Sequence, residues 1–192
     1  MAWRYIQTET IQHYIELKAS LEKDGFRIKA VVLDGRRGLI QAFSGIPIQL
    51  CIFHTQATIT RYLTKNPKLN PAKDLKEIAS FIQHVDEDIF KEMLDEWHLK
   101  HSEFLKEKTI HETSKRWSYK HRRVRSAYRS LNVNTPLIFT YKRHESLKIP
   151  TTTNGLDGGV FSPLKNLLNA HKGMAFDLRK KLIDDYLNTL VK

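Results

Sequence analysis

Acidic, sulfur and imidazole side chains follow two neighbouring apolar runs, and these residue types are suited to metal or acid–base chemistry. Asp34 ends the run AVVLD, and Cys51 and His54 form a Cys-x-x-His pair at the end of the run IPIQLCIFH. Ligands of open α/β sheets bind at the carboxyl ends of the strands. Asp34 is therefore a candidate ligand for a hard cation, although an Asp followed by Gly also suits a simple turn.

Asp157 is the second acid of interest, in the loop TTTNGLDGG before the last helical region. Asp is a preferred helix N-cap and glycines suit tight turns, so a cap is one interpretation. The other is a metal ligand, because phosphoryl transfer with two metal ions ~3.5–4 Å apart needs several carboxylates. That interpretation requires the fold to bring Asp34 and Asp157 together.

The Cys51 and His54 pair carries three possible interpretations. A structural zinc site takes four ligands, and the chain has a single cysteine. A cysteine nucleophile with a histidine base would lack a third, orienting group. The remaining interpretation is a small core cysteine beside a capping or surface histidine. One cysteine cannot form an internal disulfide, which favours a reducing, cytoplasmic location.

The charge of the chain predicts a polyanionic partner, with nucleic acid the leading candidate. Its 192 residues contain 32 Lys+Arg and 21 Asp+Glu, a net charge of +11. Neutralising phosphates releases counterions, which favours binding of such a chain to nucleic acid. No apolar run approaches the ~20 residues of a membrane span, so a membrane is not expected as a partner.

The most polarised region runs from 115 to 148, with ten Lys+Arg, one acid and interleaved aromatic residues. Its arginines are candidate phosphate contacts and Trp117 is a candidate stacking group on DNA. The alternative is a helix whose aromatic side chains pack inward while its arginines meet water. The candidate phosphate contacts are Arg122, Arg123, Arg125 and Arg129.

Apolar periodicity predicts an α/β fold with a large helical part. A strand, a short helix and a second strand at this spacing indicate a parallel β-α-β unit. Helical spacing begins at Pro71 and predicts a helical hairpin, with acids at the start of its second helix. The predicted elements are a helix at 9–23 ended by Gly25, strands at 27–34 and 46–53, a short helix at 36–43, and a helical region at 160–191.

Three segments in this order resemble one known family. They are VVLDGRRGL followed by IPIQLCIFHTQATITRYLTKNPKL, then RSAYRSL with TPLIFTY, and finally TTNGLDGGVFSPLKNLLNAHKGM. Together they are similar to the Mutator-type (MULE-like) transposases of bacterial insertion sequences, within the DDE superfamily. The resemblance covers nearly the whole chain, from Trp3 to about residue 190.

The resemblance implies an incomplete ribonuclease-H-like core interrupted by a helical insertion. It also implies three acids that hold two Mg²⁺ or Mn²⁺ ions for DNA strand cleavage and strand transfer. Asp34 matches the second acid, and Asp157 falls where the family usually has Glu, one methylene longer. Cys51 and His54 match a Cys-x-x-His signature near the second acid.

The first acid and an N-terminal DNA-binding region of the family would precede the segment at Trp3, so the chain resembles a C-terminal portion. The expected parts are 1–66 (core with Asp34), 67–148 (helical, partly basic insertion) and 149–192 (core helices with Asp157). The expected function is that of a DDE transposase fragment, inactive alone. The alternative is a non-catalytic DNA-binding protein. Expected partners are transposon ends, target DNA, and a second copy or a full-length transposase.

Overall fold

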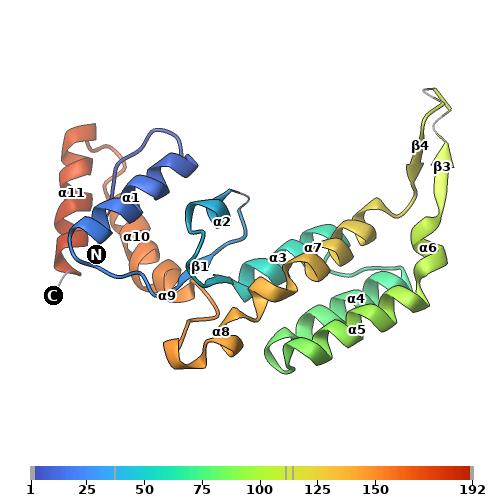
Figure 1. The fold of residues 1–192 in the computed structure, drawn as a ribbon. Coiled ribbons are helices and arrows are strands. Elements are labelled where there is room, and N and C mark those ends of the chain that lie inside the picture. The colour runs from blue at the N-terminus through green and yellow to red at the C-terminus, as the bar shows by residue number, and fades with distance from the viewer. Residues whose placement is uncertain (1–2, 37, 111, 114, 191–192) are drawn as a thin grey trace. The chain divides into compact units, whose positions relative to one another are not determined.

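The computed structural model describes residues 3–36, 38–110, 112–113 and 115–190, which form two compact units. Unit 1 combines the chain up to Ile28 with the chain from Thr153 onward, and unit 2 spans Lys29–Thr152. These boundaries differ from the three parts expected from the sequence, because both chain ends belong to one unit. The fold is α/β and mostly helical, with few short strands (Figure 1).

Unit 2 begins with the predicted parallel β-α-β unit. Strand β1 (Val31–Leu33) pairs with β2 (Ile48–Leu50) in parallel, with Val31 opposite Ile48. The short helix α2 (Leu39–Ala42) connects them. All three residues of β2 are buried, as expected for an inner strand.

The predicted second strand is shorter than expected, and this corrects the placement of the Cys-x-x-His pair. The chain leaves β2 at Leu50, and Ile52–Leu63 form helix α3. Cys51 is the residue that precedes α3, and His54 lies in its first turn rather than at a strand end. A continuous apolar run does not distinguish a buried strand from a buried helix start.

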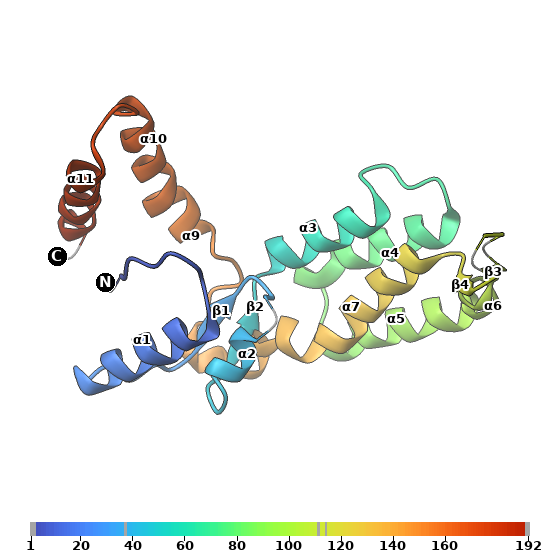
Figure 2. The same cartoon turned by 90° about the horizontal axis from the view of Figure 1, so that it is seen from above.

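Four helices pack side by side in unit 2 and form its main core (Figures 1 and 2). They are α3, α4 (Asn70–Ser80), α5 (Glu87–Lys100) and α7 (Arg122–Ile138). Helices α4 and α5 form the predicted hairpin, joined through a short 3-10 turn, η1 (Phe81–Gln83). The side chains buried between the helices include Ile59, Leu75, Ile82, Phe90, Leu94, Ala127, Leu131 and Ile138.

A two-stranded hairpin, which the sequence did not predict, lies between α5 and α7. The short helix α6 (Ser102–Lys106) leads into β3 (Lys108–Ile110), which pairs antiparallel with β4 (Trp117–Tyr119). Within unit 2 the hairpin extends past α6, away from the four helices (Figure 1). After α7 follow α8 (Thr140–Arg143) and the 3-10 turn η2 (Glu145–Leu147).

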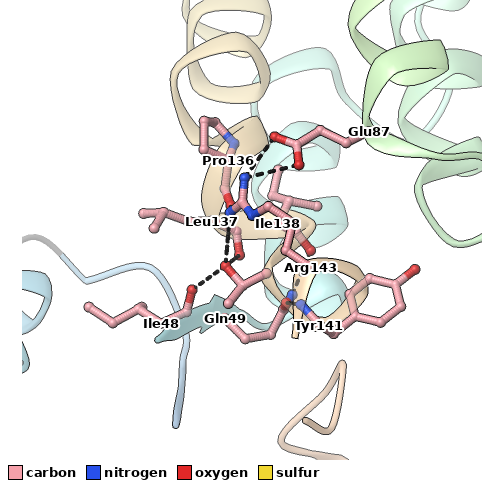
Figure 3. A network of polar contacts seen from close by, with 9 residues as sticks. Ile48, Gln49, Glu87, Pro136, Leu137, Ile138, Tyr141 and Arg143 are labelled. Carbon is pink, nitrogen blue, oxygen red and sulfur yellow. Dashed lines mark hydrogen bonds and ion pairs between the residues drawn. The ribbon is translucent and has the colours of Figure 1, made fainter. Parts of the chain in front are cut away.

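A fully buried amide, Gln49, joins the sheet to the end of α7 (Figure 3). Its Nε2 donates a hydrogen bond to the carbonyl of Ile138 at 2.7 Å, and its Oε1 accepts one from the N–H of Tyr141 at 2.9 Å. The buried Thr140 hydroxyl donates to the carbonyl of Ile48 at 2.6 Å. These bonds satisfy backbone groups that would otherwise be left unpaired where α7 meets α8.

Pro136 lies inside the last turn of α7, and its carbonyl accepts hydrogen bonds from side chains of α8. The Arg143 guanidinium donates to this carbonyl, and the Thr140 hydroxyl is 3.2 Å from it. Arg143 Nη1 also contacts both carboxylate oxygens of Glu87 at 3.0 Å, at the start of α5 (Figure 3). The end of α7 is therefore tied to β2 and to α5.

Unit 1 combines α1 (Ile11–Lys23) with a helical series at the chain's end. The predicted helix at 9–23 is confirmed, apart from its first two residues, and Gly25 follows it with φ of +84°. The series is α9 (Asn154–Leu156), the π-helical turn η3 (Asp157–Phe161), α10 (Ser162–Ala170) and α11 (Phe176–Thr189), and it starts earlier than predicted.

Polar contacts to α11 hold the N-terminal segment of unit 1. Trp3 Nε1 and the Tyr5 hydroxyl each donate to Asp184 Oδ1 at 2.9 Å. Large apolar side chains stay exposed in this unit, among them Phe26 and Phe176. Within the described parts of both units, no helix has the length and apolarity needed to cross a bilayer.

We expect Gln49→Leu to lower the free energy of unfolding by about 2–4 kcal/mol, because it removes the side-chain hydrogen bonds to the carbonyl of Ile138 and the N–H of Tyr141. Urea unfolding at pH 7 measures the change. Gln41→Leu, the same substitution at an exposed position of α2, is the control and should change stability little. Equal stabilities of the two variants would contradict this role of Gln49.

Stability should also depend on Asp74, at the contact between α4 and α5. Hydrogen bonds from Lys100 and His101 hold the pKa of this carboxyl below its usual range. The resulting stabilisation is present above the pKa of the unfolded chain, ~3.9, and is lost as pH falls through the folded-state pKa. Asp74→Asn should therefore be less stable than the native chain at pH 7, with a smaller difference at pH 3. Exposed Asp88→Asn is the matched control in the same urea titrations.

Candidate nucleic-acid interface

Helix α7 carries an apolar stripe and a basic stripe on different faces. Its buried residues recur at helical spacing, and they are Val124, Ala127, Leu131, Thr135 and Ile138. Arg122, Arg125, Arg129 and Asn132 follow a second i, i+3, i+7, i+10 pattern. At ~100° of rotation per residue the two stripes lie well apart around the helix axis. Packing of the apolar stripe thus turns the basic stripe away from the core.

The basic stripe lines a cavity of about 440 Å³, which we call the arginine cavity. Its lining residues are His98, Leu105, Tyr119, Arg122, Arg125, Ser126, Tyr128, Arg129 and Asn132. None of these nine described residues is acidic, and three are guanidinium side chains. Guanidinium groups present planar arrays of donors that match phosphate oxygens.

Arg125 is held in place at the base of the hairpin. Its Nη1 donates to the carbonyl of Leu105 at 2.6 Å, and its Cζ lies 3.6 Å from the ring centroid of Tyr119. Arg122 and Arg129 are exposed. The cavity therefore has one fixed guanidinium between two that are accessible to a ligand.

An aromatic stack forms another wall of the arginine cavity. The Tyr128 ring lies 5.2 Å from Trp97 and 4.8 Å from His98, nearly parallel to both. Burial, and to a smaller degree the negative charge of Asp95, raise the pKa of Tyr128. The phenol therefore stays neutral at physiological pH and adds no negative charge to the cavity.

The candidate phosphate contacts predicted from the sequence do not all lie in one place. Arg122, Arg125 and Arg129 share the arginine cavity, whereas Arg123 is turned ~100° from Arg122 around the helix axis and does not line it. Trp117 is not in α7 but in β4, with 56% of its surface exposed. The alternative interpretation, in which the aromatic side chains of this region pack inward, therefore applies to Tyr128 but not to Trp117.

Asp34 lies directly after β1, as predicted, and is exposed. Its Oδ1 accepts a hydrogen bond from the backbone N–H of Arg36 at 3.1 Å, which is the turn-forming arrangement expected of an Asp before Gly. Cys51, beside it at the end of β2, donates its N–H to the carbonyl of Leu33 at 2.7 Å. One exposed carboxylate therefore lies at this strand end.

Asp157 lies inside the helical series of unit 1, and it is not the N-cap that the sequence allowed. Thr153 precedes the series, and its hydroxyl donates to Asp157 Oδ2 at 3.2 Å. Asp34 belongs to unit 2 and Asp157 to unit 1. A common metal pocket for the two carboxylates stays a prediction.

Cys51 and His54 contact one another at the start of α3. The distance between His54 Nδ1 and Cys51 Sγ is 3.2 Å, and Cys51 is 1% exposed. Among the residues that the structure describes, no group of three or more His, Cys, Asp or Glu side chains is placed to hold a metal ion. The geometry fits the interpretation of a small core cysteine, with His54 beside it in the first turn of α3.

Comparison of the chain with family models, curated proteins and solved structures finds no match.

We expect Arg125→Ala to lower the free energy of unfolding by about 1–2 kcal/mol, because it removes both the bond to Leu105 and the contact with the Tyr119 ring. Urea unfolding tests this. Arg123→Ala, an exposed arginine of the same helix, should change stability by less than about 0.5 kcal/mol. A similar loss in both variants would show that Arg125 does not anchor the hairpin.

Proposed function

We propose that this chain is a DNA-binding part of a DDE-type transposase, and that unit 2 contacts the phosphate backbone through the arginine cavity. The observation that carries the proposal is the row of three guanidinium groups on one face of α7, in a cavity without an acidic lining residue. Arg122 and Arg129 are seven residues apart, or ~10 Å along the helix axis. That length matches ~3 phosphates of one DNA strand at ~3.4 Å each.

The transposase part of the proposal rests on the sequence resemblance and on Asp34. The parallel β1–β2 pair with Asp34 after β1 is compatible with a ribonuclease-H-like core, in which this carboxylate would be the second metal ligand. Asp34 would bind Mg²⁺ or Mn²⁺ through oxygen, and the resemblance implies Asp157 as the third acid. When bound, the metal ions would activate a water molecule or a 3′-hydroxyl for strand cleavage and transfer. In this proposal, the residues of the arginine cavity bind and orient the DNA backbone.

A non-catalytic DNA-binding protein is the second candidate. It is favoured by the exposed position of Asp34, whose carboxylate accepts the N–H of Arg36, and by the lack of a metal-holding group among the described residues. This candidate shares the arginine cavity with the first. The two differ only in whether DNA bound there is cut.

Binding to a fluorescent 24-bp duplex between 50 and 300 mM NaCl tests the arginine cavity. Arg122→Gln/Arg129→Gln should weaken binding and reduce the slope of log K against log salt by about 2, because each phosphate contact contributes ~0.9. Arg123→Gln, with the same lost charge outside the cavity, should change the slope much less than Arg129→Gln. An unchanged slope in the double variant would exclude the arginine cavity as the binding site.

Incubation with supercoiled plasmid and Mn²⁺ tests whether this chain cuts DNA. Nicking that Asp34→Ala abolishes, while salt-dependent binding persists, supports a transposase and excludes the non-catalytic protein. Binding without nicking excludes cleavage by this chain alone, and it is the result expected both of the non-catalytic protein and of a transposase fragment that is inactive alone. Because Asp34 lies outside the arginine cavity, Asp34→Ala should bind the duplex as the native chain does.

A further inference from the structure

The β3–β4 hairpin has one face made of large apolar, aromatic and cationic side chains. Residues directly opposite in an antiparallel pair lie on the same face, and so do those two positions along. Ile110 lies opposite Trp117, and Lys108 lies opposite Tyr119. We call these four residues the stacking face. Ile110 is 68% exposed and Trp117 56% exposed.

Cations and rings alternate along the stacking face and into the arginine cavity. Lys108 Nζ lies 4.3 Å from the Trp117 ring centroid and 6.0 Å from that of Tyr119. The Arg125 guanidinium covers Tyr119, which itself lines the cavity. The stacking face is therefore continuous with the arginine cavity, through Tyr119 and Arg125.

The charge around the stacking face indicates an anionic ligand. Lys120 and His121 pair with Glu107, and the Lys120 hydrogen bond, followed by that of His121, lowers the pKa of this carboxyl, so it stays ionised and paired. The ionic side chains from 106 to 120 in the described part of the hairpin are Lys106, Lys108, Lys115, Arg116 and Lys120 against Glu107 and Glu112.

An anionic ligand that also needs flat apolar surfaces is a nucleotide with an accessible base. Aromatic rings stack on bases of any sequence, and neighbouring cations contact the backbone. In an intact duplex the faces of the bases are already stacked on each other. An exposed ring such as Trp117 can therefore gain a stacking contact with an unpaired base or with the last base pair at a duplex end, but not inside the duplex.

We propose that the stacking face binds unpaired DNA bases, with Trp117 as the stacking ring, next to a duplex held in the arginine cavity. This inference rests on the proposed DNA-binding function and specifies its substrate as DNA with a single-stranded end. The duplex supplies the phosphates for Arg122 and Arg129. The unpaired nucleotides that leave it meet Trp117 and Lys108.

Competition between two DNA probes tests this inference on the full chain. One is a 24-bp duplex, and the other a 20-bp duplex with a four-thymine 3′ overhang, which carries fewer phosphates. The native chain should bind the overhang probe at least fivefold more tightly, in line with base–aromatic stacking. Trp117→Leu should lose this preference, Trp117→Phe should keep part of it, and both should keep the salt slope on the duplex.

Phe176→Leu, at an exposed aromatic residue of unit 1, is the matched control and should keep the preference. Circular dichroism of each variant establishes that the hairpin substitution leaves the helices folded. Equal affinity of the native chain for both probes, or a preference that survives in Trp117→Leu, would overturn the inference while leaving DNA binding intact. Failure to bind either probe would instead overturn the proposed function.

Discussion

The buried amide of Gln49 is the interaction on which the arrangement of unit 2 depends. A two-stranded parallel sheet is too small to form a stable layer by itself, and it needs a cover on its faces. Gln49 points from β2 into the end of α7 and satisfies both a carbonyl and an N–H there. Because an unpaired polar group in this position would be costly, the amide permits one placement of α7 against the strand. The position of the basic stripe on α7 follows from that placement.

Elements with clear periodicity were predictable, while those with ambiguous patterns were not. Helix α1 and the α4–α5 hairpin follow from apolar residues at helical spacing, and the parallel β1–β2 pair follows from two apolar runs with a short connection. The end of β2 was not predictable, because Cys51 and Ile52 continue the apolar run into a helix. The β3–β4 strands are three residues each, and their cross-strand pairs emerge only once the turn between them is formed.

For the candidate site, residue types were predictable but their grouping was not. The charge of the basic region identified its arginines, but Arg122, Arg123, Arg125 and Arg129 were all predicted as candidate phosphate contacts. Counting them in steps of three and four would have separated Arg123 from the other three, since the buried stripe of α7 has the same spacing. The position of Asp34 at a strand end was predictable from the apolar run that precedes it. Its relation to Asp157 was not, because 123 positions of chain separate them and no local pattern encodes that distance.

Pro136 has a consequence for the backbone hydrogen bonds of α7. A proline has no N–H, so the carbonyl of Asn132, four residues earlier, receives no helical hydrogen bond from position 136. Asn132 is also the last residue of the basic stripe and lines the arginine cavity. The helix therefore lacks one backbone hydrogen bond at the residue where its basic stripe ends.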